Sequence, residues 1–234
     1  MKQKLHMSIS TFQLWNRSFG WGVFSLALLT FGLTVEPTAS FWDAGEYIAT
    51  AAKLQVGHPP GAPLFQMMGA FFALFSTSPE NIALMVNYMS VFSSAFTVLF
   101  LFWTLTLLMK KLPTFQSLDN TPERLTFFGS AAVGALAFCF SDSFWFNAVE
   151  AEVYAMATFI LSLLFWLGLR WEQDMNTPRG DRWLLLISFI IGLSFGVHFM
   201  GLLTIPAIGM IYYFKNTPKV TVKSFLLANV ISRS

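Results

Sequence analysis

The chain has 234 residues, of which 55% are hydrophobic and 11% are charged, and its formal net charge is +2. A soluble domain usually has about 25% charged residues, so the composition excludes an ordinary soluble protein and indicates an integral membrane protein. The small net charge, without a basic run interleaved with aromatic residues, argues against a nucleic-acid partner. The single cysteine, Cys139, excludes a disulfide framework within the chain.

Apolar runs follow one another at 19–35, 63–75, 82–109, 125–140, 153–169 and 183–214. A helix needs about 20 residues to cross a bilayer. The second run is short for this and is predicted to be an interfacial or re-entrant helix. The last is too long for one crossing and divides near 197–201, with Pro206 as a kink. The pattern predicts six transmembrane helices, and 220–231 resembles the start of a seventh.

The positions of the lysines and arginines provide an independent test of this transmembrane topology, because cytoplasmic loops carry an excess of these residues. Twelve of the 14 fall on alternate loops: Lys2, Lys4, Arg17, Lys110, Lys111, Arg124, Arg170, Arg179, Arg182, Lys215, Lys219 and Lys223. Lys53 falls on the other side and Arg233 is undecided. The N-terminus is therefore predicted to be cytoplasmic, and seven of the 12 acids fall on the opposite face: Glu36, Asp43, Glu46, Glu80, Asp142, Glu150 and Glu152.

The first non-cytoplasmic loop, residues 36–81, is the most informative segment. Asp43 and Glu46 are three residues apart, so in a helix their carboxylates share one face. Such a pair can bind a cation, share a proton or act as a base with a helper, or it can merely cap a surface helix. His58-Pro59-Pro60-Gly61 cannot continue a helix. We therefore expect a helix over 44–54, while His58 also fits a simple turn residue.

The second loop, residues 141–152, contains no lysine or arginine. Both loops contain Ser-Phe-Trp followed by an acid, at 40–46 and at 143–150, and we expect them to meet at one site. Glu150 and Glu152 are two residues apart and should point in different directions on a helix. One of the two is expected to face solvent.

The segment Gly192-Leu193-Ser194-Phe195-Gly196 matches the G-x-S-x-G nucleophile pattern. That pattern needs a strand-turn-helix elbow, whereas this segment lies in an apolar helix. Gly192 and Gly196 are better explained as a small-residue face for close helix packing. The sequence gives no support for zinc proteolysis or nucleotide use, because it lacks H-E-x-x-H and the glycine-rich phosphate-binding motifs.

Four segments together resemble a large family of bacterial membrane proteins that is similar to the protein O-mannosyltransferases of the GT-C glycosyltransferase class. They are Trp42-Asp43-Ala44-Gly45-Glu46, His58-Pro59-Pro60-Gly61-Ala62-Pro63, Glu150-Ala151-Glu152-Val153-Tyr154 and Gly192-Leu193-Ser194-Phe195-Gly196-Val197-His198. The resemblance implies an all-α integral membrane fold, in which the external loop 36–81 carries an acidic motif and interfacial helices. It also implies that 1–234 is a single transmembrane domain, the N-terminal part of a larger GT-C module.

The resemblance further implies an inverting sugar transfer, with mannose as a candidate, from a polyprenyl-phosphate carrier to a Ser or Thr of an exported protein. The reaction is expected on the non-cytoplasmic face of a bacterial inner membrane. An inverting displacement needs a base, for which Asp43 is expected, while Glu46 would orient or tune it or help it to hold a divalent cation. GT-C enzymes often have adjacent acids, whereas two residues separate these. The expected substrate-binding residues are Trp42, Lys53, His58, Glu150, Glu152, Tyr154 and His198, with Trp145 as a further stacking ring.

Two other classes of function stay open, an ion-coupled transporter and a non-catalytic scaffold subunit. Acids near a membrane also form proton and cation sites. A transporter is expected to hold its binding groups near the bilayer midplane, whereas these acids gather in loops on one face. His198, which lies in an apolar hairpin, also fits a hydrogen-bonded packing residue.

Overall fold

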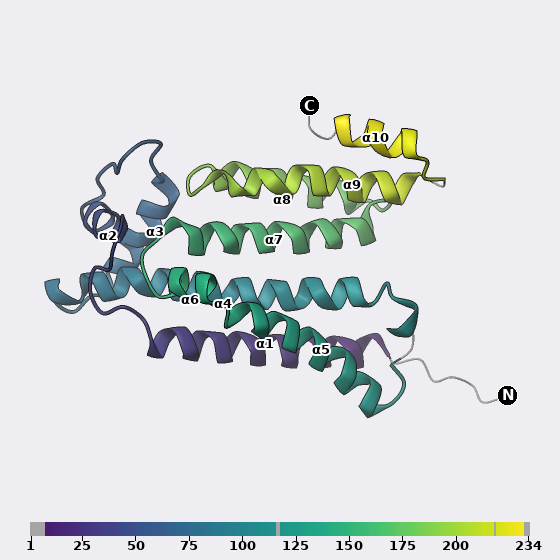
Figure 1. The fold of residues 1–234 in the computed structure, drawn as a ribbon, viewed down its shortest axis with the longest axis horizontal. Helices are drawn as coiled ribbons and strands as arrows, with labels where there is room; N and C mark the ends of the chain where they lie inside the picture. Colours follow the sequence, from purple (N-terminus) through teal and green to yellow (C-terminus); the bar gives the residue numbers. More distant parts are fainter. Residues whose placement is uncertain (1–7, 116–117, 218, 232–234) are drawn as a thin grey trace.

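The computed structural model describes residues 8–115, 118–217 and 219–231, and every regular element in these ranges is helical (Figure 1). The all-α fold expected from the sequence is thus confirmed, while Lys2, Lys4 and Arg233 lie outside the described residues. The helices are α1 (Ile9–Leu33), α2 (Ala44–Lys53), α3 (Pro63–Ala73), α4 (Ile82–Met109), α5 (Thr121–Cys139), α6 (Asp142–Ala148), α7 (Val153–Asp174), α8 (Gly180–Ser194), α9 (Thr204–Asn216) and α10 (Val222–Ile231). Three short 3-10 helices are η1 (Pro79–Asn81), η2 (Pro113–Phe115) and η3 (Phe199–Leu203).

Helix α4 is the centre of the bundle and packs against α1, α5 and α7. Small side chains on α4, including those of Ser90, Ser94 and Ala95, are fully or almost fully buried, which allows neighbouring helices to approach closely. One apolar cluster joins α1, α4 and α5 around Phe102 and Phe127. A second cluster gathers around α7 and includes Phe65 and Val197, so it extends to the end of the bundle where α3 lies.

The chain is an integral membrane protein, but the expectation of six spans was too high. Among the described residues, two helices are long and apolar enough to cross a membrane, Pro79–Met109 and Val153–Asp174. A third qualifies if the bent pair α5 and α6 forms one span. The remaining apolar runs are helical but fall short for physical reasons: α1 contains Asn16 and Arg17, and α8 and α9 have only 15 and 13 residues.

The short run at 63–75 does not form a span, as the sequence predicted. Helix α3 has 11 residues, so it is only about 16 Å long, roughly half of a bilayer core. It packs against α2 and α4. The close approach to α2 depends on Gly69, where an added Cβ would lie 2.8 Å from that of Ala51.

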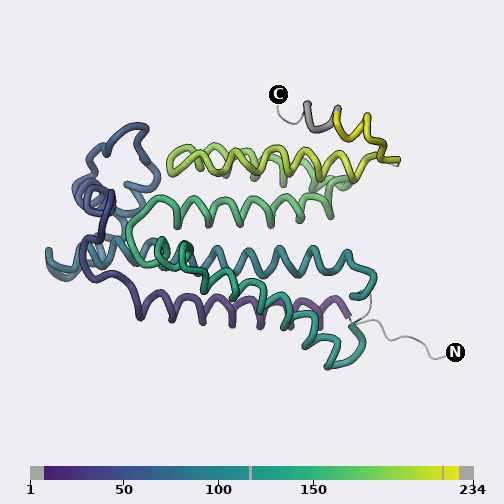
Figure 2. The backbone as a smooth tube through the Cα atoms, viewed as in Figure 1, coloured from purple at the N-terminus to yellow at the C-terminus, as the bar shows by residue number. Residues whose placement is uncertain are grey.

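The backbone trace places the connecting segments at two ends (Figure 2). The α4–α5, α7–α8 and α9–α10 connections lie at the end where α1 begins, and most of the described cations lie in these connections or in the helix turns next to them. Helices α2 and α3, the α6–α7 connection and the α8–η3 turn lie at the other end. The segregation of charges along the sequence is therefore a segregation between the two ends of the bundle.

The α8–η3 turn docks directly on the first turn of α3. The carbonyl oxygen of Gly196 accepts hydrogen bonds from the backbone N–H groups of Leu64 and Phe65, at 2.7 and 3.2 Å. These two N–H groups belong to the helix start, where intrahelical acceptors are missing. The expected small-residue face at Gly192 and Gly196 is wrong, because Gly196 lies outside the helix and a Cβ added to Gly192 would meet no atom within 4 Å.

We expect Gly196→Ala to destabilise the protein, because its Cβ would lie 2.8 Å from the Cβ of Leu64 and 3.2 Å from its backbone nitrogen. Such overpacking typically costs about 1–3 kcal/mol. Gly192→Ala is the matched control and should be neutral or stabilising, since alanine favours a helix over glycine. Thermal unfolding in detergent measures both, and equal melting temperatures for the two variants would contradict the docking role of Gly196.

Candidate functional site

A cavity of about 220 Å³ opens at the end of the bundle that carries α2 and α3. Four segments contribute to it: the start of α2, the turn before α3, the start of α7 and the α8–η3 turn. Its polar and charged lining residues are Asp43, Tyr47, His58, Glu152, Tyr154 and His198. The two acidic loops expected to meet therefore do so, and the segment around His198 joins them.

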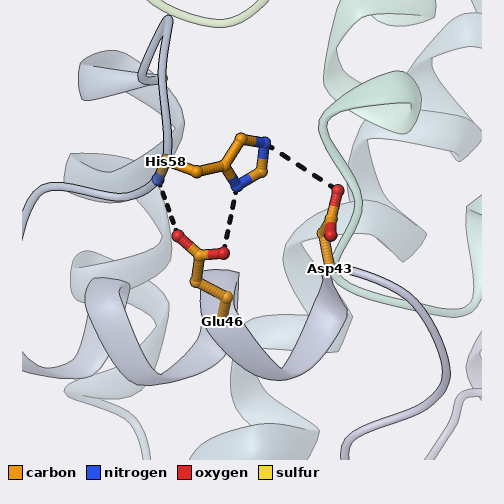
Figure 3. A group of neighbouring side chains, drawn as sticks. All are labelled: Asp43, Glu46 and His58. Carbon is orange, nitrogen blue, oxygen red and sulfur yellow. Dashed lines mark hydrogen bonds and ion pairs between the residues drawn. The ribbon is translucent and has the colours of Figure 1, made fainter.

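Asp43, Glu46 and His58 form a compact group (Figure 3). Asp43 and His58 also line the cavity. Asp43 immediately precedes α2 and Glu46 lies in its first turn, and His58 reaches back to them from the turn that the prolines impose. Glu46 accepts two hydrogen bonds from His58, from the backbone N–H at 2.6 Å and from ring Nδ1 at 3.0 Å. The other ring nitrogen, Nε2, lies 3.9 Å from a carboxylate oxygen of Asp43.

This geometry assigns different tasks to the two acids. The side chain of Asp43 makes no capping hydrogen bond to α2, so helix capping does not explain it. Glu46 holds the imidazole of His58 with both of its oxygens, whereas Asp43 faces the cavity. The residue immediately before the pair, Trp42, has a positive φ of 59° and is 88% exposed, so its indole projects freely beside Asp43.

The hydrogen bonds between Glu46 and His58 move both pKa values. The pKa of His58 is raised, mainly by its side-chain hydrogen bond to Glu46, and the pKa of Glu46 is lowered, mainly by the same bond. The raised pKa of His58 stabilises the fold below the ordinary histidine pKa, and this contribution is lost as pH rises through the folded value. The lowered pKa of Glu46 stabilises the fold above the ordinary glutamate pKa. The charged pair of Glu46 and His58 is therefore fully formed between the ordinary pKa values of glutamate and histidine.

Glu152 is 7% exposed and lines the cavity from the residue preceding α7. Burial raises its pKa to about 7, and the negative charges of Glu150 and Asp43 add to this, against hydrogen bonds from the backbone of Asp43 and Val153. The carboxyl therefore exchanges its proton near neutral pH. Across the cavity, burial and the charge of Glu152 raise the pKa of Tyr47 to about 12, so its phenol stays a hydrogen-bond donor.

Glu150 and Glu152 have different surroundings, but residues 149–152 are not helical, so the helical spacing argument does not apply to them. Glu150 accepts a hydrogen bond from the hydroxyl of Ser40 and does not line the cavity. The backbone N–H of Glu36 also donates to the carbonyl of Val149, at 2.9 Å. The expectation that one glutamate faces solvent is wrong, because Glu150 is only 3% exposed. The contacts with residues 36–40 cover it, and they could not be read from local spacing.

The aromatic residues separate into two groups. Tyr154 lines the cavity and its ring lies 5.4 Å from that of His198. His198 also accepts a hydrogen bond from the backbone N–H of Met200 at 3.2 Å, so it has both a packing and a cavity-lining position. Trp145 was expected as a stacking ring for the sugar, but it packs edge-on against Phe31 in the core. The two Ser-Phe-Trp segments are therefore not equivalent.

Three of the expected substrate-binding residues do not line the cavity: Trp42, Lys53 and Glu150. Trp42 directly precedes Asp43 and Glu150 is covered by residues 36–40, whereas Lys53 lies exposed at the far end of α2. Tyr47 also lines the cavity, although it is not among the site residues expected from the sequence. Its position four residues after Asp43 on a helix was the available signal, because residues four apart share a face.

The group of Asp43, Glu46 and His58 also has the composition of a metal site. One ligand atom from each lies within 4.8 Å of the others. Two carboxylates and an imidazole suit Zn²⁺ and similar divalent ions. The sequence pointed only to Asp43 and Glu46, and His58 joins them through the turn.

Residues 43–221 match the family model described as the protein O-mannosyl-transferase TMEM260 N-terminal domain. The chain is also similar to protein O-mannosyl-transferase tmem260 of Dictyostelium discoideum, with 24% identity over 196 residues, and to protein O-mannosyl-transferase TMEM260 of Mus musculus, with 30% identity over 176 residues. These regions cover 79% and 74% of this chain but 22% of each relative, so the chain spans about a fifth of the length of these curated relatives. No solved structure gave a significant match.

Proposed function

The chain belongs to the family of protein O-mannosyl-transferase TMEM260 N-terminal domains, and on this premise we propose that it is the N-terminal part of a membrane glycosyltransferase. It moves a sugar from a polyprenyl-phosphate carrier to a Ser or Thr hydroxyl of an exported protein, on the non-cytoplasmic face. Mannose is the sugar suggested by the relatives' names. The observation that carries the proposal is the cavity lined by Asp43, His58, Glu152, Tyr154 and His198.

The proposed reaction forms a bond between the acceptor oxygen and the anomeric carbon, and it breaks the bond from that carbon to the carrier phosphate. Asp43 takes the proton of the attacking hydroxyl, and the bonding electrons leave with the phosphate oxygen. The Asp43 carboxylate is suited to this task because it lines the cavity and its side chain is 57% exposed, so an acceptor can reach it.

His58 supplies positive charge for the departing phosphate. Its raised pKa favours the imidazolium form, and its Nε2 is the ring nitrogen that Glu46 does not use. Charge placed in advance where a negative charge develops lowers the barrier of such reactions. Glu46 is therefore a positioning residue, which acts through His58. The small cavity has room for one sugar ring, and the rings of Tyr154 and His198 form one of its walls.

A lipid-linked donor is supported by a second, apolar groove. This groove of about 360 Å³ lies between α3, α4, α7 and α8, and Ser93 is the only polar residue among those that line it. Leu64 lines the groove, and its backbone N–H bonds the turn at Gly196 that borders the polar cavity. A carrier with its sugar phosphate in the cavity could therefore lay its polyprenyl chain in the groove, where apolar burial is favourable.

The position of the cavity favours an enzyme over a transporter. Asp43 and Glu152 each stand at the start of a helix, at one end of the bundle, and not midway along a span. A transporter of an ion or small molecule is expected to bind near the midplane. The test is transfer of mannose from a polyprenyl-phosphate donor to a Ser/Thr-containing peptide by the purified full-length protein. Absence of transfer, together with ion-coupled uptake in proteoliposomes, would overturn the proposal.

Glu46→Gln is expected to lower transfer by about tenfold, less than loss of the base itself. A glutamine can still accept one N–H, but it cannot hold His58 in its charged form. The loss should therefore grow as pH rises through the ordinary histidine pKa, because the variant's imidazole gives up its proton earlier than the wild type's. A pH profile of transfer measures this, and an equal loss at all pH values would exclude the charge-holding role.

A divalent cation is the competing explanation for the same three residues. If Asp43, Glu46 and His58 held such an ion, it would neutralise charge on the phosphate. We expect transfer to persist after dialysis against a chelator, because both oxygens of Glu46 are occupied by His58. Loss of transfer that returns on adding Zn²⁺ or Mn²⁺ would instead assign a metal site.

A further inference from the structure

A second large cavity, of about 630 Å³, lies at the end of the bundle opposite to the Asp43 cavity. It is lined by the first half of α1, the end of α4, Phe115 and Leu118, and the last turns of α7. Figure 1 shows that these helix ends gather on the side away from α2 and α3. Nothing in the proposed glycosyl transfer uses this cavity.

Three cations line this second cavity: Arg17, Lys110 and Arg170. None of its lining residues is acidic, and within the part of the chain that the structure describes none of the three forms an ion pair with a carboxylate. The partners they do have are neutral: the ammonium of Lys110 lies 3.4 Å from the ring centre of Phe12, and Arg170 donates to a side-chain oxygen of Gln173. Lys111, just outside, is paired with Glu172.

Among the described residues, no carboxylate lies within ion-pair distance of these three cations. The pKa of Lys110 is lowered by desolvation of its ammonium and by repulsion from Arg170. Like charges held together in this way favour the binding of an anion, which relieves the repulsion. Phosphate groups are recognised by such arginine and lysine clusters.

The rest of the lining indicates that the anion is amphiphilic. Apolar and aromatic side chains, including those of Trp103 and Trp166, make up about half of the lining residues. A volume of about 630 Å³ falls in the range of roughly 300–1,000 Å³ typical of sites for drug-sized organic ligands. This volume is larger than an inorganic phosphate ion alone would fill. Basic pockets between transmembrane helices on the cytoplasmic side bind lipid headgroups, and the charge distribution predicts this end to be cytoplasmic.

We propose that this second cavity binds the phosphate headgroup of an anionic phospholipid, from the leaflet opposite to the Asp43 cavity. Arg17, Lys110 and Arg170 hold the phosphate, and the aromatic wall holds the first part of the acyl chains. The site would anchor α1, α4 and α7 to one another at this end. It is a separate site from that of the transferase reaction and does not depend on it.

The test is retention of lipid by the full chain, measured by native mass spectrometry after addition of phosphatidylglycerol or phosphatidylcholine with identical acyl chains. The wild type should retain phosphatidylglycerol preferentially. Arg17→Gln, Lys110→Gln and Arg170→Gln should each weaken this binding about fivefold, the equivalent of about 1 kcal/mol per basic residue near an anionic headgroup. Equal retention of the two lipids by the wild type would overturn the proposal, whether or not the variants fold.

Arg182→Gln is the matched control, because Arg182 is exposed at the same end of the bundle but does not line the cavity. It should retain phosphatidylglycerol as the wild type does, and an equal loss would mean that only the overall charge of this end matters. Competition with inorganic phosphate distinguishes a lipid headgroup from a soluble phosphate, because both would bind the same three cations. If millimolar phosphate displaces the retained lipid, the ligand is a soluble phosphate and the lipid assignment is wrong. Asp43→Asn should leave retention unchanged, which separates this site from the proposed function.

Discussion

Asp43→Asn should reduce sugar transfer by about 10²- to 10⁴-fold, the usual effect of losing a general base. Asparagine keeps the size of the side chain and much of its hydrogen bonding, but it cannot accept the proton of the acceptor hydroxyl. Folding should survive, because Asp43 makes no helix-capping hydrogen bond and its side chain is 57% exposed. The stability change should stay within about 0.5 kcal/mol, as for other surface substitutions. Transfer of mannose to a Ser/Thr peptide and thermal unfolding measure the two effects.

Asp142→Asn provides the matched control for this substitution. Asp142 is an exposed acid at the start of α6, does not line the cavity and undergoes the same chemical change. Its transfer rate should equal that of the wild type. A well-folded Asp43→Asn protein with wild-type transfer would remove Asp43 as the base and favour the transporter or scaffold explanations.

Glu152→Gln should make the protein more stable at pH 8 by up to about 3 kcal/mol, while leaving it almost unchanged at pH 4.5. In the unfolded chain the Glu152 carboxyl loses its proton near the ordinary glutamate pKa, whereas in the folded protein its pKa is raised to about 7. Between these values the folded state binds more protons, so wild-type stability falls as pH rises and then levels off above the folded pKa. The upper limit follows from about 1.4 kcal/mol per pKa unit. Glutamine, which stays neutral, avoids this loss.

The same variant should flatten the pH dependence of transfer near pH 7. Ionised Glu152 repels the donor phosphate in the cavity, so wild-type transfer should decline as the carboxyl loses its proton, and the glutamine variant should not show this decline. Glu150→Gln is the comparison, because Glu150 is also buried but bonds Ser40 and does not line the cavity. It should alter stability without altering the pH profile of transfer. An unchanged profile in Glu152→Gln would remove Glu152 from the site.

Several parts of the site could be predicted from neighbouring residues alone. The spacing of Asp43 and Glu46 indicated a shared helix face, and the prolines after His58 indicated a corner that ends the preceding helix. Both features are local, because they depend on helical periodicity and on the missing N–H of proline. The roles within the pair were not predictable, since the hydrogen bonds of His58 to Glu46 join residues 12 apart through a turn whose path depends on packing.

The sequence by itself determined the class of protein, the helices and the separation of charges between two ends, because composition and periodicity report on solvent and on local backbone preference. It overestimated the number of spans, because α8 and α9 are shorter than a helix that crosses a bilayer and α1 contains Asn16 and Arg17. Only the tertiary structure decided that Glu150 is covered by residues 36–40, that Trp145 belongs to the core and that Tyr47 and His198 line the same cavity as Asp43. These positions depend on contacts between segments far apart in the chain, such as the bond from Leu64 to Gly196, and no local pattern encodes such contacts.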